Sequence, residues 1–217
     1  LETGAGSLTL SGALALTDNA SLNSSGGTIT LKSGGTSTGS VVSLPGTTLV
    51  LENPLSLTGA TLKTNGTTFT TNANALSLSN SSILEVEGTQ DLSGVFPDST
   101  STLRLTADAS INDSAALSVG TLDLSDFALT LNDQMAGLSI AQPVTLDAAG
   151  EKILTGAADL SLNGGISATA GILSSTGGTL SLPIGATLAT GASFSTSNTT
   201  LNLGGSLAVA DTWTSTS

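Results

Sequence analysis

The chain has 217 residues, with 38% hydrophobic and 2% aromatic residues, 16 acidic and 4 basic residues, and neither His nor Cys. The formal net charge of −12 and four scattered cations argue against binding to nucleic acid and against electrostatic attachment to an anionic membrane. Without Cys and His, the chain lacks disulfides, thiolate or imidazole metal ligands and a Ser-His-Asp triad. No apolar run reaches the length of about 18 residues that a membrane-spanning helix needs.

Short runs of alternating Leu or Ile recur along the first part of the chain. One series is Leu8/Leu10, Ile29/Leu31 and Leu49/Leu51, and a second is Leu55/Leu57 and Leu76/Leu78. The alternation places both apolar side chains of a run on one face of a strand of about 3 to 5 residues. Turns such as Asn65-Gly66 separate the runs, because Gly and Asn accept the positive φ that tight corners require.

The pattern changes in the middle of the chain and returns after it. Residues 88–91 (Gly-Thr-Gln-Asp) and 96–99 (Phe-Pro-Asp-Ser) break the alternation, so we expect either a loop that leaves the coil or one enlarged corner near residues 87–102. The alternation returns at Leu103/Leu105 and loosens again from Asn132 to Gly156. A third series then follows, with Leu160/Leu162, Leu180/Leu182 and Leu201/Leu203.

These repeats predict the fold class. A strand this short cannot bury its face alone, but three strands with turns form a coil of about 20 residues, and stacked coils turn each strand into one rung of a parallel sheet. We therefore predict an all-β fold, a single-stranded parallel β-helix (β-solenoid) of about 10 coils that spans residues 1–217 as one segment. The alternatives are an antiparallel sandwich, which needs longer strands and more aromatic residues, and disorder. The mean hydropathy of +0.32 argues against disorder.

Ser and Thr make up about a third of the residues, and the short repeats combine them with Leu, Gly and Asn. The clearest repeats are Thr-Leu-Asn-Leu-Gly-Gly-Ser-Leu at residues 200–207, Thr-Leu-Ser-Leu at 179–182 and Gly-Thr-Ile-Thr-Leu at 27–31. Together with the lack of Cys, this pattern resembles the passenger domains of bacterial autotransporters and the related filamentous-haemagglutinin-type surface adhesins. The resemblance implies a right-handed parallel β-helix outside a Gram-negative-type cell. Since the chain begins at Leu1 and no membrane-embedded barrel is recognisable, we expect a fragment of a longer surface protein.

Acidic residues are the candidates for chemistry. Twelve of the 16 lie from Glu85 to Asp159, and those nearest the irregular region are Glu85, Glu87, Asp91, Asp98, Asp108, Asp113, Asp123, Asp126 and Asp133. Paired carboxylates about 5 to 10 Å apart could hydrolyse glycosides, and Asp residues on successive coils could bind Ca²⁺. The simpler interpretation is that they are solvated residues that keep the rod soluble. We assign no catalytic, metal-binding or cofactor-binding residue and no cofactor.

Two further features concern the surface and the end of the chain. Thr28, Thr30 and the Thr residues of 67–71 could form a flat Thr array, which resembles the face of ice-binding solenoids. Such an array needs the same register in many coils, and the Ser, Asp, Asn, Lys and Ala residues between them favour an ordinary outward β surface. Trp213 either caps the last coil or begins another.

Two classes of function remain open. In the first, the chain is a non-enzymatic structural or adhesive segment of a secreted or cell-surface bacterial protein, a stiff stalk or display surface about 50 Å long at about 4.8 Å per coil. Its partners would be an extracellular protein or glycan surface, and copies could associate end to end through strand edges, with no nucleic acid and no direct membrane insertion. In the second, it is a glycan-binding or polysaccharide-degrading β-helix that uses the acidic middle region. The sequence favours the first.

Overall fold

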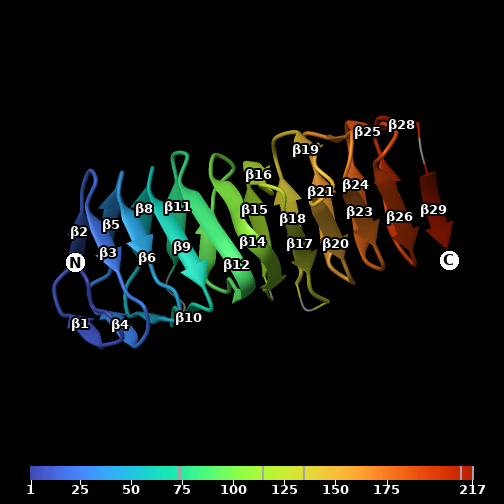
Figure 1. The fold of residues 1–217 in the computed structure, drawn as a ribbon. Helices are drawn as coiled ribbons and strands as arrows, with labels where there is room; N and C mark the ends of the chain where they lie inside the picture. Colours follow the sequence, from blue (N-terminus) through green and yellow to red (C-terminus); the bar gives the residue numbers. More distant parts are fainter. Residues whose placement is uncertain (73–74, 114, 134, 211, 217) are drawn as a thin grey trace.

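The computed structural model describes residues 1–72, 75–113, 115–133, 135–210 and 212–216. These residues form 29 strands and no helix, and hence no helix among them is long and apolar enough to cross a bilayer. The strands stack in parallel in about 10 coils spaced about 21 residues apart. The result is an elongated rod with the two termini at opposite ends (Figure 1). The predicted parallel β-solenoid is confirmed.

Each coil of the N-terminal half contributes one strand to each of three parallel sheets. The first sheet contains β1 (Leu8–Leu10), β4 (Thr28–Leu31), β7 (Thr48–Leu51) and β10 (Thr68–Thr70). The second contains β2 (Leu14–Leu16), β5 (Gly35–Thr38), β8 (Leu55–Thr58), β11 (Leu76–Ser79) and β13 (Val95–Pro97). The third is the long sheet of the rod, which begins with β3 (Ser21–Asn23), β6 (Val41–Ser43) and β9 (Thr61–Asn65).

The C-terminal half is again built from three strands per coil. The long sheet continues with β17 (Ala128–Leu131), β20 (Lys152–Thr155), β23 (Ile172–Ser175), β26 (Ser193–Ser197) and β29 (Thr212–Thr216). The fourth sheet contains β15 (Ala116–Val119), β18 (Gly137–Ile140), β21 (Asp159–Leu162), β24 (Thr179–Leu182) and β27 (Thr200–Leu203). The fifth contains β19 (Val144–Leu146), β22 (Ile166–Ala168), β25 (Gly185–Leu188) and β28 (Ser206–Val209).

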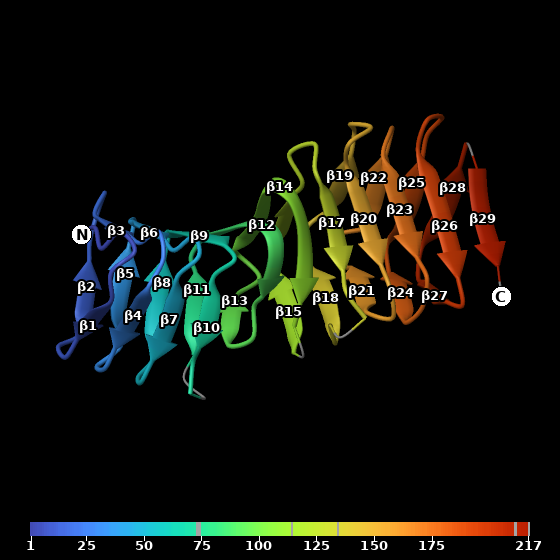
Figure 2. The same cartoon turned by 60° about the horizontal axis from the view of Figure 1, so that its bottom comes forward.

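Two long strands join the halves: β12 (Ile83–Asp91) and β14 (Thr102–Asn112). In the coil before them the chain turns at Gly66 between β9 and β10; β12 pairs with β9 up to Glu87, has a left-handed residue at Gly88, and continues to Asp91 with a register shift against β14. The first part of β14 pairs with β16 (Thr121–Asp123), and its later part pairs with β17. The long sheet therefore shifts sideways here (Figure 2). We call β12, β14 and β16 the junction.

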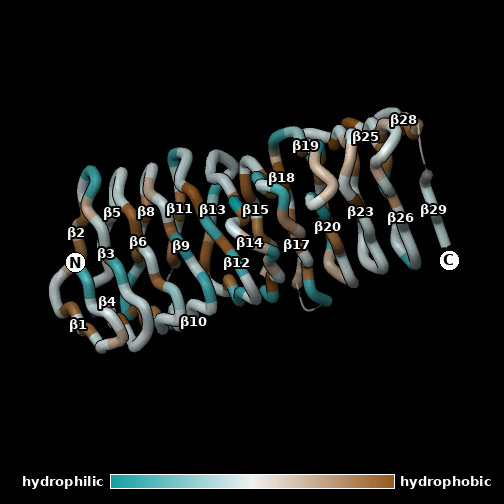
Figure 3. Tube along the Cα trace, viewed as in Figure 1, coloured by the Kyte–Doolittle hydropathy of each residue, from teal (hydrophilic) through white to brown (hydrophobic). Residues whose placement is uncertain are grey.

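The three predicted Leu series are the strand registers of the rod. Leu8 pairs with Ile29 and Ile29 with Leu49 in the first sheet. The second series is in register between β8 and β11, and the third between β21, β24 and β27. Hydropathy alternates along the strands, as Figure 3 shows, because apolar side chains point into the rod and Ser, Thr and charged residues point out.

The structure corrects the expectation of an irregular loop near residues 87–102. Residues 88–91 belong to β12, and β13 pairs in register with β11. The alternation is hidden in the sequence because Gln90 and Pro97, rather than aliphatic residues, occupy buried positions. Gln90 is fully buried, and its amide nitrogen donates to the Glu87 carbonyl at 3.0 Å. The segment therefore stays within the coil, with turns on either side of β13.

The core consists of columns of aliphatic side chains that run along the rod. One column crosses the junction: Leu62, Leu84 and Leu103 have no exposed surface, and Leu122 retains 8%. Burying one such side chain contributes roughly 1.5 to 3 kcal/mol. Since each Leu packs against the Leu one coil away, the stability of every coil depends on its neighbours.

One corner of the N-terminal half repeats the same backbone conformation in four successive coils. Asn19, Gly39, Gly59 and Asn80 precede β3, β6, β9 and β12 and have φ values of 63°, 56°, 56° and 52°. The backbone N–H of Asn19 donates to the Gly39 carbonyl in the next coil. The N–H groups of Gly39 and Gly59 each donate to the carbonyl of a strand residue one coil further on. Only Gly and Asn occupy these positions because a left-handed conformation is costly for other residues.

We predict that Gly59→Ala lowers the free energy of unfolding by about 1 kcal/mol, because Ala is strained at positive φ. A Cβ at Gly59 would meet only the Asn80 carbonyl oxygen, at an ordinary 3.5 Å, so the effect isolates the backbone strain. Gly12→Ala is the matched control, since a Cβ there meets no atom within 4 Å and φ is not positive. Urea unfolding measures both, and an equal effect of the two substitutions would contradict the prediction.

Candidate functional site

A ladder of alternating charges crosses the junction on its outer face. Lys63 on β9 pairs in register with Glu85 on β12, Glu85 with Arg104 on β14, and Arg104 with Asp123 on β16. Each rung places one long charged side chain beside the next, because outward positions of paired parallel strands lie directly above one another. We call these four residues the charged ladder.

The ladder is connected by three ion pairs, which are the ion pairs found within the described ranges. Lys63 Nζ lies 3.0 Å from Glu85 Oε2, Arg104 Nη1 lies 3.7 Å from Glu85 Oε1, and Arg104 Nε donates to Asp123 Oδ2 at 2.8 Å. The Glu85 side chain is only 14% exposed, between partners that are 48% and 37% exposed. The charges cancel, and the ladder fastens four successive coils at the point where the sheet shifts.

The ladder also sets the ionisation of its last member. Partial burial is the largest single influence on Asp123 and acts to raise its pKa, but the hydrogen bonds from Ser125 and Arg104, with the Arg104 charge, together lower the pKa. Asp123 is therefore held as a carboxylate by its neighbours. This arrangement differs from a glycosidase pair, in which one acid must stay protonated to donate a proton.

A polar groove of about 300 Å³ lies beside the ladder. It lies where the pairing of β12 with β14 shifts register, with Glu87 opposite the bulge of β14 that contains Thr106, and its lining residues come from four coils. The residues that shape it are Pro45, Lys63, Asn65, Glu85, Glu87 and Thr106. Both carboxylate oxygens of Glu87 are engaged, one by the Asn65 side-chain amide and the other by the Thr106 hydroxyl at 3.0 Å. The groove thus combines acceptors and donors on fixed strands.

The acids on the other side of the junction form a second, smaller group. Ser93 Oγ donates to Asp91 Oδ1 at 2.6 Å and lies 3.3 Å from Asp113 Oδ1 in the next coil. Asp113 is only 3% exposed, and this burial raises its pKa. In the turn after β13, the Thr100 hydroxyl donates to Asp98 at 2.7 Å and holds the pKa of Asp98 below its usual value. These acids organise turns.

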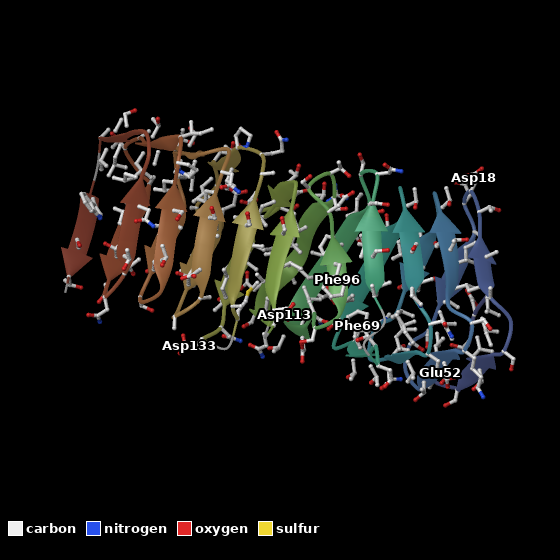
Figure 4. The ribbon with its side chains drawn as sticks, turned by 180° about the vertical axis from the view of Figure 1, so that it is seen from behind. Asp18, Glu52, Phe69, Phe96, Asp113 and Asp133 are labelled. Atoms are coloured by element: carbon white, nitrogen blue, oxygen red, sulfur yellow. The ribbon has the colours of Figure 1, made fainter. Side chains whose placement is uncertain are left out.

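Several of the predicted acids link one coil to the next. Asp108 Oδ1 accepts the Ala128 backbone N–H at 2.9 Å, and Asp133 Oδ1 accepts that of Ala157 at 2.9 Å. Asp126 is exposed at a corner with φ of 74°. In Figure 4, Asp113 and Asp133 lie along the same edge of the rod. The expectation of purely solvated acids is therefore refined, since the carboxylates of Asp108 and Asp133 cross-link coils.

The described residues bring together no group of three Asp or Glu side chains that could hold a metal ion. The charged ladder was missed in the sequence, although a signal was present. Residues of alternating charge sign recur there at intervals of 22, 19 and 19 residues, from 63 to 85, 104 and 123. This interval equals one coil, and a search for charges at the coil period would have found it.

The other outward surfaces are mainly columns of hydroxyl side chains. In the first sheet, Thr28, Thr48 and Thr68 are in register, but Thr30 and Thr70 pair with Val50, so the Thr array considered from the sequence forms in one column of three coils only. Similar columns follow the second and fourth sheets, with Thr36, Ser56 and Ser77 in one and Ser118, Ser139, Ser161 and Ser181 in the other. These columns contain no charged residue, which leaves broad neutral polar surfaces along the rod.

Two aromatic residues are exposed. Phe96 continues the hydroxyl column of the second sheet and is 50% exposed. Trp213 lies in β29, stacks on Phe194 with ring centroids 6.0 Å apart and an angle of 13°, and retains 44% exposure. Trp213 therefore extends the long sheet as a further rung.

No protein-family model, curated protein or solved structure matches this chain.

We predict that Arg104→Gln lowers the free energy of unfolding by about 1 kcal/mol, a modest value because the Arg104 side chain is 37% exposed and screened by solvent. Lys152→Gln is the control, since none of the ion pairs found within the described residues includes Lys152. Urea unfolding at low salt and at about 1 M salt checks the origin of the effect, because salt screens exposed charges. A loss that is the same at both salt concentrations would exclude the electrostatic explanation.

The lowered pKa values of Asp98 and Asp123 predict a loss of stability in acid. The folded chain binds fewer protons there than the unfolded chain, so the contribution is present above the ordinary Asp pKa of about 3.9 and is lost as pH falls through the lower folded-state values. We expect Asp98→Asn to flatten the decline of the thermal midpoint below about pH 4.

Asp113→Asn is the control of opposite sign. Burial raises the pKa of Asp113, so the ionised carboxylate opposes folding at neutral pH, and we expect Asp113→Asn to keep or raise the midpoint at pH 7. Thermal unfolding followed by circular dichroism between pH 2 and pH 7 compares the thermal midpoints of the unsubstituted chain, Asp98→Asn and Asp113→Asn. Parallel pH profiles for the three would show that these carboxylates do not control acid stability.

Proposed function

We propose that the chain is a structural and adhesive segment of a secreted or cell-surface bacterial protein, of the autotransporter-passenger or filamentous-haemagglutinin type, that acts as a stiff stalk or display surface. The observation that carries this proposal is the stack of about 10 coils, whose two halves are joined at the junction by parallel pairing that runs through one register shift. A stack of this kind resists bending, because each bend would separate many backbone hydrogen bonds at once.

The outward surface supports the adhesive part of the proposal. Hydroxyl columns in register present a repeated set of donors and acceptors, and broad polar contacts of this kind suit an extracellular protein or glycan surface. With an interval of about 4.8 Å between rungs, an extended partner meets the same chemistry at every coil. Many weak contacts along one rod add up to strong attachment when the rod is part of a larger surface protein.

The alternative, a polysaccharide-degrading enzyme, would use the acidic middle region. Asp123 and Asp126 are the residues to test for it, since Asp123 ends β16 of the junction and Asp126 lies in the turn that follows. Asp123 already accepts from Arg104 and Ser125, so it is occupied by protein partners. The mixed donors and acceptors of the groove fit recognition of a glycan better than hydrolysis.

Beads coated with the chain test the proposal. We expect saturable attachment to at least one of a panel of host cells, matrix proteins and polysaccharides. The double variant Ser56→Glu, Ser161→Glu adds charges to two hydroxyl columns and should reduce attachment about five-fold, because an approaching polar surface must then accommodate an unpaired charge. Asp18→Asn, at an exposed corner labelled in Figure 4, is the control.

A different result would overturn the proposal. If uncoated beads attach as well as coated ones, the rod has no adhesive surface. If the chain instead cleaves a surface polysaccharide and Asp123→Asn or Asp126→Asn abolishes the cleavage, the enzymatic alternative is correct.

A further inference from the structure

The polar groove at the junction differs from the rest of the surface. The hydroxyl columns are flat runs of one kind of side chain, whereas the groove gathers a cation, carboxylates, an amide and a hydroxyl around about 300 Å³. This volume is at the lower end of the range for small-ligand sites, which place a few polar groups around one molecule. It fits a ligand about the size of one sugar ring.

The hydrogen-bonding groups of the groove match vicinal hydroxyls. Glu87 presents two carboxylate oxygens, each with lone pairs beyond those that accept from Asn65 and Thr106. Lys63, whose side chain is 48% exposed, supplies further donors at the other side. A sugar hydroxyl both donates and accepts, so neighbouring hydroxyls can donate to the carboxylate and accept from the ammonium group. Pro45 offers an apolar wall for the C–H face of a ring.

The charge of the groove selects among glycans. The two cations and two anions of the charged ladder cancel, and none of the ion pairs found among the described residues includes Glu87. Glu87 therefore leaves a net negative charge in the groove, on a chain of net charge −12. A uronic acid or sulfated sugar would be repelled, whereas a neutral sugar would form charge-assisted hydrogen bonds to Glu87.

The groove is also preorganised. Its side chains project from β9, β12 and β14, and the Asn65 and Thr106 hydrogen bonds fix the Glu87 carboxylate from both sides. Little conformational entropy is lost when a ligand binds to groups that are already held. We propose that this groove binds one sugar residue of a neutral glycan, an inference that rests on the adhesive function above and assigns it a specific site.

Titration with soluble oligosaccharides tests the inference. The probes are neutral glucan, mannan and galactan oligosaccharides, with oligogalacturonate as the acidic counterpart, and binding is followed by calorimetry and by saturation-transfer NMR. We expect saturable binding of at least one neutral probe and at least about tenfold weaker binding of the acidic one. Glu87→Gln should weaken the neutral probe about tenfold, because the charge-assisted hydrogen bonds are lost.

The control is Glu52→Gln, the same substitution at an exposed corner of the N-terminal half (Figure 4), which should leave binding unchanged. Thr106→Val is a second variant that should weaken binding by freeing the Glu87 carboxylate. The inference is overturned if no neutral probe saturates, if the acidic probe binds as tightly, or if Glu52→Gln has the same effect as Glu87→Gln. If coated beads attach normally while Glu87→Gln changes nothing, the site is wrong but the adhesive function stands.

Discussion

Each coil of this protein is stable only because the next coil covers its apolar face. Strands of three to five residues, such as β4 and β9, cannot bury their Leu and Ile side chains within one coil, and the buried column from Leu62 to Leu103 shows how adjacent coils solve this. The packing of each coil on the next fixes the register of the paired strands, and this register decides which residues face outward. The surface columns and the charged ladder are therefore consequences of the core, because a slip of one residue would turn every side chain to the other face.

The junction is where this constraint is hardest to meet. The long sheet shifts sideways between β9 and β17, so the backbone pairing that supports the rod runs through β12 and β14 alone. Gln90 is buried there with one side-chain oxygen that lacks a hydrogen-bond partner, which makes this interior less favourable than an aliphatic one. The charged ladder lies on the outer face of these same strands. We infer that its ion pairs help to hold the register where the core contributes less.

Much of the fold could be predicted from the sequence, and the reasons for the exceptions are local. The Leu8, Leu55 and Leu160 series revealed the register because period-2 alternation and the coil interval coincide there. The strand character of residues 88–91 was hidden because a polar residue, Gln90, faces inward. The groove could not be predicted, since it lies at a bulge where β14 carries two more residues than β12, and the Leu alternation does not mark this bulge.

The distribution of charge along the rod follows from the same geometry. Glu85, between paired strands, meets two cations one coil away, whereas Asp108, in the bulge of β14, and Asp133, in a turn, accept backbone N–H groups of the next coil. Glu87 lies at the register shift between β12 and β14, and its carboxylate is held by neutral donors. The Glu87 carboxylate is thus fixed beside the groove at the register shift between β12 and β14, where it is placed for a partner from outside.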